Sequence, residues 1–488
     1  MPMKRSPLPR TLTPLVSVAL LASSLSSGRA QELEHEAGAS APRPDEAPSA
    51  PRVPPDYDGR EDASDPVEGA LWVPRVLLFP LYVVSEYVVR RPLGALTQLV
   101  EKENILSKLE DAFTFGPNDN IGIIPTALID FGFHGSVGVY FFWNDFLAPD
   151  NDLRVNVSTG GHRWLKGQVA NRIPLGGGTT LQLEGHALQR PDLRYWGTGY
   201  DSVDEAEGAF EIRALGGGLR LRDELAQKGS FFESWIVGRA LDFGNGECED
   251  PTVWAGEPPR FGCEEPTIRG AVRTGKYPIP LGFEGYSLVE AGTRLVLDSR
   301  APRPDPGSGV ALDLNLRKLA LLEARSSGGW LAWGGSAAAF LDLTGTQRVL
   351  SLTVSAQFVS PTTGATEIPF TELVGARRHD DRPDADLLHG FRPGRVLGES
   401  ATVASLEYRW PVWTWVDGIL QTGVGNTFGP HLEDFAPERL RFALSGGLRS
   451  ANHRDHSLNV LLGFGTETFE QGAAPMDLRF MVGGSVGF

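Results

Sequence analysis

Apolar and polar residues alternate along most of this chain, from about residue 119 to the C-terminus. Residues 311–317 read ALDLNLR, in which leucines occupy every second position and Asp, Asn and Arg lie between or after them. Residues 350–355 read LSLTVS and show the same period of two. Because successive side chains of a β-strand point to opposite faces, this pattern predicts strands with one apolar and one polar face.

Sixteen such segments can be delimited, which is an even number, as bacterial outer-membrane barrels require. The pattern therefore predicts an all-β fold, a 16-stranded antiparallel transmembrane β-barrel over residues 119–488. The candidate strands are 119–129, 132–143, 151–160, 163–173, 179–189, 207–222, 230–242, 285–298, 309–321, 332–343, 348–359, 400–410, 416–428, 439–449, 456–466 and 478–488.

The lengths of the connections agree with a membrane barrel. If the first strand runs outward, the long connections 190–206, 243–284 and 360–399 all fall on the outer side. The short connections, such as 174–178 and 344–347, all fall on the periplasmic side. Short periplasmic turns and longer outer loops are typical of outer-membrane barrels.

The first 30 residues have the parts of a secretory signal peptide. A basic start is followed by an apolar run over residues 12–25 and by small residues at Gly28 and Ala30, which suit signal peptidase. The basic residues of the start are Lys4, Arg5 and Arg10. A transmembrane anchor is disfavoured because the run is short and contains serines. We therefore expect an exported chain that is cleaved after Ala30.

Two further segments precede the predicted barrel. Residues 31–70 are rich in Pro, Ala, Asp and Glu, which predicts a disordered periplasmic leader. Residues 71–115 change to a helical pattern interrupted by prolines, which predicts a short amphipathic helical segment. This segment either lies against the inner leaflet or plugs the barrel base, or it packs as a cap on the barrel rim.

Composition restricts where this chain can act. After the signal peptide, no apolar run reaches the ~20 residues of a spanning helix, so membrane insertion would require a closed barrel. A mean hydropathy of −0.16 with 41% hydrophobic residues fits such a barrel. Removing four basic signal-peptide residues from a net charge of −16 leaves −20, which argues against a nucleic-acid partner.

The two cysteines, Cys248 and Cys263, lie in one long outer connection that is rich in Gly, Glu and Pro. In an exported protein this favours a disulfide that closes an exposed loop. A zinc site is the weaker interpretation because no His lies near the pair. The nine His of the chain show no metal-ligand spacing, so the sequence assigns neither a metal nor a cofactor.

Residues 387–400 read LLHGFRPGRVLGES and are followed by ATVASLEYRWPV. Together they resemble the bacterial surface antigen family, the outer-membrane barrel shared by BamA and TamA. In that family an outer loop carrying Val/Ile-Arg-Gly-Phe/Tyr enters the lumen and precedes a strand with a Glu-Tyr-Arg-like core. The residues that the resemblance assigns to this lumenal loop are Leu388, His389, Gly390, Phe391, Arg392 and Arg395.

Two other patches support the resemblance. LVLDSRAPRPDPGSG, around Asp298 and Arg300, is similar to the family's Asp-x-Arg turn. RYWGTGYDS, with Tyr195, Gly197 and Gly199, is similar to an aromatic-Gly-x-Gly segment of the same barrels. The resemblance covers about residues 119–488. It does not extend to the family's periplasmic POTRA domains, for which the residues before the predicted barrel leave no room.

The chain departs from the family at the loop itself. His389 replaces the family's loop arginine, and Gly423 aligns with the aspartate that is its usual lumenal partner. The alternation of the following strand points Glu407 into the lumen. We therefore expect Arg392 or Arg395 to bind Glu407 and so to hold the loop.

The last strand carries a recognisable terminal signal. Alternating apolar residues ending in an aromatic are what the barrel-assembly machinery recognises, and Gly483, Val486 and Phe488 fit that pattern. The machinery is thus an expected partner, as the inserter of this chain. Residues 483–487 also fit Gly-x-Ser-x-Gly, but a hydrolase elbow needs a strand-to-helix turn and here the chain ends within a strand. We predict no enzymatic activity.

Two functions from different classes remain. The resemblance implies an integral protein of the Gram-negative outer membrane that contacts its lipid and acts in protein insertion, secretion or lipid handling. Unfolded proteins or lipids would be its clients. The physical basis would be a labile seam between the strand near 119–129 and the last strand, where an unpaired edge could bind a client strand. The alternative is a passive pore or a structural barrel that displays the cysteine loop.

Overall fold

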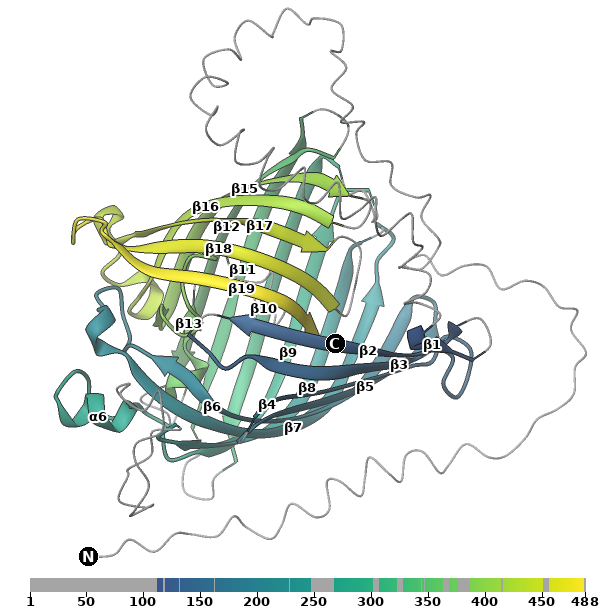
Figure 1. The fold of residues 1–488 in the computed structure, drawn as a ribbon, viewed down its shortest axis with the longest axis horizontal. Helices are drawn as coiled ribbons and strands as arrows, with labels where there is room; N and C mark the ends of the chain where they lie inside the picture. Colours follow the sequence, from purple (N-terminus) through teal and green to yellow (C-terminus); the bar gives the residue numbers. More distant parts are fainter. Residues whose placement is uncertain are drawn as a thin grey trace, which may run out of the picture. The chain divides into compact units, whose positions relative to one another are not determined.

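We describe the protein from a computed structural model (Figure 1). The described residues are 112–116, 119–130, 132–161, 163–227, 229–246, 267–301, 307–322, 328–343, 345, 347–362, 368–375, 387–413, 416–450 and 456–486. The predicted signal peptide, the leader, most of the predicted helical segment, both cysteines and Phe488 lie outside them.

The described chain forms one large antiparallel sheet that closes on itself. The first half of the wall consists of β2 (Ile121–Asp130), β3 (Ser136–Trp143), β4 (Asp152–Gly161), β5 (Trp164–Gly176), β6 (Thr179–Tyr195), β7 (Gly208–Glu224), β8 (Phe231–Gly244) and β9 (Tyr286–Asp298). The second half consists of β10 (Gly309–Leu321), β11 (Gly329–Asp342), β12 (Val349–Pro361), β15 (Ser400–Trp413), β16 (Val416–Phe428), β17 (Arg441–Ser450), β18 (His456–Thr468) and β19 (Pro475–Val486). These sixteen strands correspond one to one with the predicted segments, and the predicted all-β barrel is confirmed.

Each strand pairs with its neighbours in sequence, and β19 pairs with β2 to close the barrel. In Figure 1 the last strand, in yellow, runs beside the first barrel strand, in blue. The minor elements are β1 (Thr114–Phe115), the two-stranded sheet of β13 (Val374–Gly375) and β14 (Leu397–Gly398), the helix α6 (Ile268–Arg273), and the 3₁₀ turns η6 (Asp204–Ala206), η8 (Phe370–Glu372), η10 (Pro430–Leu432) and η11 (Pro437–Arg439).

The two ends of the barrel differ. The long connections 196–207, 245–285 and 362–399 all leave the same end, which we call the loop end, and the opposite end, which we call the turn end, carries only shorter connections. Several strand boundaries differ from the predicted ones, and β6 runs to Tyr195, six residues beyond its predicted end at 189. Residues 132–135 form a turn, because Gly132 adopts a φ of 90° and Phe133 N–H donates to the Asp130 carbonyl, so β3 starts later than expected. At the end of the predicted helical range, Ala112 and Phe113 are helical, but β1 then pairs with β2.

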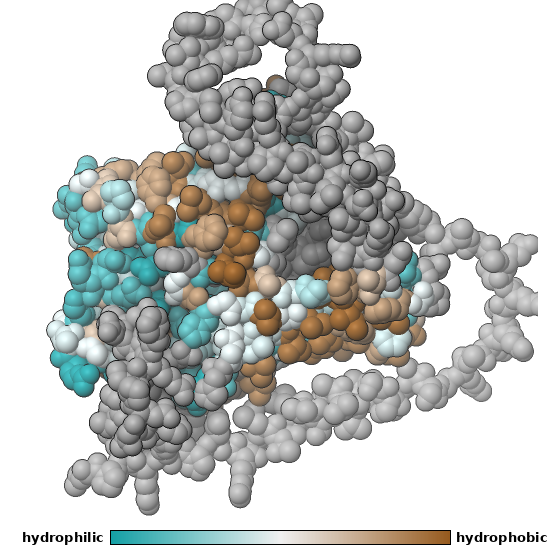
Figure 2. Space-filling model, viewed as in Figure 1, coloured by the Kyte–Doolittle hydropathy of each residue, from teal (hydrophilic) through white to brown (hydrophobic). Residues whose placement is uncertain are grey.

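The wall is apolar outside and polar inside. On β12, Leu352 and Val354 are each 50% exposed on the outer face, whereas Ser351, Thr353 and Ser355 are buried on the lumenal face. Figure 2 shows apolar side chains gathered over the wall, while hydrophilic side chains cover the loop end. An exposed apolar belt of this extent is typical of a surface that faces lipid. Among the described residues, no helix has the length and apolar character needed to cross a bilayer.

The lumen near the loop end is filled by a cluster of buried apolar side chains. Inward-facing Phe243 and Trp330 of the wall belong to this cluster, and so do Ile268 of α6 and Phe370 of η8. The Phe370 ring lies 5.1 Å from Phe243 and 5.3 Å from Tyr195, with the rings inclined at 57° and 73°. The outer connections are thus packed against the inner face of the wall at this end.

Candidate functional site: the lumenal loop and the barrel seam

The loop that the sequence singled out lies inside the barrel. Residues 387–396 fold through two tight turns, in which Phe391 N–H donates to the Leu388 carbonyl and Arg395 N–H donates to the Arg392 carbonyl. Gly394 supplies the left-handed conformation that the second turn needs, with a φ of 84°. The side chains of Leu388 and Phe391 are buried among inward-facing residues of the wall.

Glycines in the wall make room for this loop. A Cβ atom on Gly465 of β18 would lie 2.4 Å from the Phe391 ring, and one on Gly390 would lie 2.0 Å from the Phe464 carbonyl oxygen. A Cβ on Gly423 of β16 would lie 2.8 Å from Leu388. The position that aligns with the family's aspartate is therefore filled by the loop itself.

Arg392 is the main ionic anchor of the loop. Its Nε lies 2.7 Å from Asp477 Oδ1, and its backbone N–H donates to Asp477 Oδ2 at 2.8 Å. Its guanidinium also reaches Glu207 and Asp204 of the 196–207 connection and lies 4.8 Å from the Trp196 ring centroid. Burial alone would lower the pKa of Arg392, but the three carboxylates raise it above its usual value.

Arg395 is held by a neutral partner. It is fully buried, and its two terminal nitrogens donate to Ser202 Oγ at 2.8 Å and to the Ser202 carbonyl at 2.9 Å. Burial lowers the pKa of Arg395 to about 10, despite the nearby Asp477 and Asp204. Arg441 of β17 donates to the same Ser202 carbonyl at 2.7 Å, so two buried arginines hold this connection.

The acceptors of these two arginines thus differ from Glu407, the partner that the sequence favoured. Glu407 faces the lumen on β15, but its carboxylate lies 3.7 Å from Arg449 of β17.

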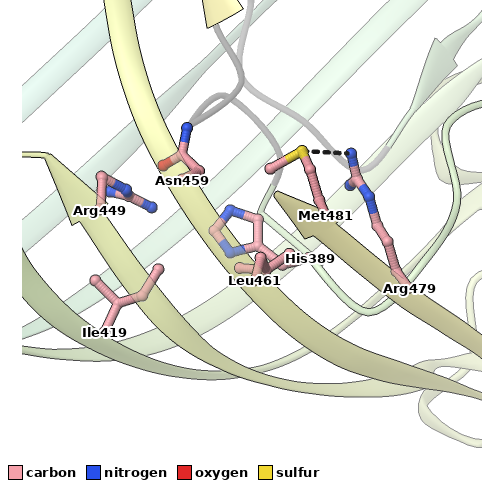
Figure 3. A pocket seen from close by; sticks show the side chains of 7 residues that line it. All are labelled: His389, Ile419, Arg449, Asn459, Leu461, Arg479 and Met481. Carbon is pink, nitrogen blue, oxygen red and sulfur yellow. Dashed lines mark hydrogen bonds between the residues drawn. The ribbon is translucent and has the colours of Figure 1, made fainter. Parts of the chain in front are cut away.

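His389 is buried in the lumen, with its backbone N–H 3.4 Å from Gln421 Oε1. Figure 3 shows the His389 ring among the side chains that line a small pocket. The pocket is lined by His389, Ile419, Arg449, Asn459, Leu461, Arg479 and Met481.

The seam between β19 and β2 is the weakest junction of the wall. Among the described residues, three residue pairs join these strands, namely Met481 with Asp130, Val482 with Ile129 and Gly483 with Leu128. By contrast, eleven pairs join β18 to β19. Because each pair of an antiparallel ladder brings backbone hydrogen bonds, closure here rests on few of them.

Gly483 permits the close approach of the two strands at one end of the paired stretch. A Cβ atom there would lie 2.2 Å from the Ala127 carbonyl oxygen, and the residue has a φ of 149°. Of the other terminal-signal residues, Val486 ends β19 and Phe488 lies outside the described residues. Ser485 of the Gly-x-Ser-x-Gly match lies within β19 and not at a strand-to-helix turn.

A buried ion pair crosses the seam. Arg479 of β19 lies 3.3 Å from Asp130 of β2, and their side chains are 7% and 11% exposed. Arg479 Nη1 also donates to the Phe391 carbonyl at 3.4 Å. The same side chain therefore contacts the opposite strand of the seam and the lumenal loop.

Side chains of β6 and of the following connection hold the β2–β3 turn. His134 N–H donates to Asp192 at 2.7 Å, and Arg194 donates to the Gly132 carbonyl at 3.4 Å while pairing with Glu207 at 3.2 Å. The RYWGTGYDS patch, residues 194–202, spans the end of β6 and the start of this connection, so two segments that the sequence matched to one family meet in space. The third patch lies at the turn end, where Arg300 pairs with Asp298 at 2.6 Å.

Sequence reasoning missed Asp130, Asp477, Arg479, Trp196 and Ser202. The alternation of the last strand could have placed Asp477 and Arg479 on the lumenal face. It does not show which loop residues reach them. Among the described residues, no group of three or more His, Cys, Asp or Glu is arranged to hold a metal ion.

No model of a known protein family matches the sequence. A search of curated proteins also returned no match. The fold is similar to that of BamA from Haemophilus ducreyi lacking POTRA domains 1–3, with a TM-score of 0.50 and 14% identity over 75% of this chain and 70% of that one.

Two CdiB structures are also similar. CdiB from Acinetobacter baumannii has a TM-score of 0.46 and 10% identity over 76% of this chain and 60% of its own. CdiB from Escherichia coli has a TM-score of 0.45 and 12% identity over 75% and 63%. At 14% identity, the likeness to BamA shows a shared architecture, so the described chain has the fold of a BamA-type barrel.

Proposed function

We propose that this chain is an integral outer-membrane barrel that opens along the β2–β19 seam to admit a client, in outer-membrane protein insertion, secretion or lipid handling. The observation that carries the proposal is the three-pair seam, set in a wall whose other junctions are long. The exposed apolar belt supports a membrane location, and the predicted signal peptide supports export.

An open seam would present unpaired backbone on both sides. The part of β2 between residues 123 and 127 lies between the three seam pairs and the two pairs that Ile121 and Gly122 form with β1, and it includes Pro125, a residue that strands tolerate chiefly at edges. Backbone donors and acceptors at such an edge can pair with an added strand. Unpaired backbone is costly in a bilayer, so a client strand would stabilise the open state.

A passive pore fits the lumen less well. The apolar cluster around Phe243, Trp330 and Phe370 lies in the lumen near the loop end, and the 387–396 loop occupies the side next to β16–β19. A water-filled channel requires a polar lumen that is clear along its length. Steady single-channel conductance of the purified protein would favour the pore over the seam.

A cysteine pair across the seam tests the proposal. Ile129 and Val482 are directly opposite one another, and opposite residues of an antiparallel pair have Cα spacings that suit a disulfide. In a background with both native cysteines replaced by Ser, Ile129→Cys with Val482→Cys should abolish complementation of a deletion strain. Complementation would be scored by outer-membrane protein and lipid content, and reductant should restore it.

The matched control is Val139→Cys with Val157→Cys, an outward-facing opposite pair on β3 and β4. It adds the same bond within a continuous part of the wall, and it should leave activity intact. Full complementation by a completely oxidised seam variant would refute the proposal.

A further inference from the structure

The two strands of the seam are offset, and the offset leaves part of β19 without a partner strand on that side. The last pair toward the loop end is Met481 with Asp130, where β2 ends. In the same register the residue opposite Arg479 would be Gly132, which lies in the turn and has no side chain. Within the described residues, the stretch of β19 from 475 to 480 therefore pairs only with β18.

Side chains close this part of the seam in place of a backbone ladder. Asp130 reaches diagonally to Arg479, and Arg479 also donates to the Phe391 carbonyl. Figure 3 shows Arg479 and Met481 on β19 beside the lumenal pocket. A buried guanidinium requires anionic or hydrogen-bonding partners. Asp130 is the anionic partner that β2 supplies to Arg479.

The lumenal face of the β19 edge presents three residues to any strand that pairs there. Asp477 is 1% exposed and already binds two donors of Arg392, and Met481 is apolar. Arg479 is different, because its carboxylate belongs to β2 and leaves with that strand when the seam opens. A strand that replaces β2 thus meets an arginine whose Asp130 partner has left with β2.

The geometry points to Arg479 as the docking residue for a carboxylate on the lumenal face of a polypeptide strand that pairs with β19. This inference rests on the proposed opening of the seam and identifies the client as an extended segment that carries a carboxylate at this position. A planar guanidinium binds carboxylates with two parallel hydrogen bonds, which favours Asp or Glu over their amides at this position.

Synthetic peptides with the sequence of residues 121–132 can test the inference. Each carries Ile129→Cys, and the two forms differ only in Asp or Asn at position 130. The full-length chain carries Val482→Cys and lacks its native cysteines, so that a peptide in the seam forms a disulfide with it. We expect the Asp peptide to form half-maximal adduct at about a tenfold lower concentration than the Asn peptide, which corresponds to about 1.4 kcal/mol.

Arg479→Gln should abolish this preference, and Arg479→Lys should keep part of it. Folding of both variants is checked by heat-modifiable migration in gels. Equal adduct yields from the two peptides would overturn the carboxylate inference and leave the opening seam in place. A preference that survives Arg479→Gln would assign recognition to another residue and overturn it too. No adduct from either peptide, with the Val482→Cys thiol reactive toward a small maleimide, would count against the opening itself.

Discussion

Replacing Asp477 by Asn should loosen the lumenal loop. Asp477 accepts two hydrogen bonds from Arg392, at 2.7 and 2.8 Å, and is 1% exposed. A hydrogen bond to a charged group contributes about 1.5–3 kcal/mol. Asn keeps one acceptor and the shape of the side chain, and Arg392 keeps its longer contacts with Glu207 and Asp204. We therefore expect a loss near the lower limit, about 1.5–2 kcal/mol.

That loss raises the population of the released loop about 10- to 30-fold. Hydrogen exchange of peptides covering residues 387–396 measures this population, because amides there exchange when the loop leaves the wall. Exchange should rise by this factor in Asp477→Asn. The strands β9 and β10, which lie outside the loop contacts, should exchange as before.

Asp313→Asn is the matched control. Asp313 also forms a two-point pair with an arginine, Arg294, at 3.0 and 2.6 Å, and it is 15% exposed in the wall. The control removes the same charge without touching the loop, so exchange of residues 387–396 should not change. Unchanged loop exchange in Asp477→Asn, or an equal rise in the control, would refute the assigned anchor.

Two further changes test the seam and the loop end. Gly483→Val should prevent the three-pair register, because its Cβ would lie 2.2 Å from the Ala127 oxygen. Formation of the Ile129→Cys/Val482→Cys disulfide should therefore fall. The control Gly167→Val, at a position with open space around it, should leave disulfide formation unchanged. Burial, and to a smaller extent the charge of Glu433, raise the pKa of Glu399. The contribution of Glu399 to the stability of the fold is therefore present at low pH and is lost as pH rises through the raised pKa. Glu399→Gln should remove this dependence of stability on pH. The measurement is hydrogen exchange of the backbone amide of residue 399 between about pH 4 and 7, after correction for intrinsic rates.

The strands were predictable because a membrane wall imposes one rule on every residue. Outward positions must be apolar and lumenal positions tolerate charge, so the period of two survives along all sixteen segments. Turns follow weaker rules. The β2–β3 turn was read as strand because Phe133 fits an alternating pattern, whereas the positive φ of Gly132 ends β2 at Asp130.

The anchor of the loop was not predictable for a different reason. Alternation tells which face a residue occupies but not which partner its side chain takes. Glu407 is on the lumenal face and lies opposite Gln421, which the His389 backbone approaches, but its carboxylate pairs with Arg449. Asp477 lies two residues after the start of β19, where Arg392 reaches it. The choice of partner depends on the path of the loop, which the sequence pattern does not encode.

The position of the anchor has a consequence for how the seam works. In the family that the sequence resembles, the loop arginine binds an aspartate that aligns here with Gly423, on an internal strand. In this chain Leu388 fills the space at Gly423, and the loop is instead tied to β19 through Asp477 and Arg479. The strand that holds the loop is thus the strand that closes the barrel. A force that displaces the loop acts first on β19, where three backbone pairs and the Asp130 ion pair resist it. Loop release and seam opening should therefore occur together, and the loop contacts set the resistance to opening.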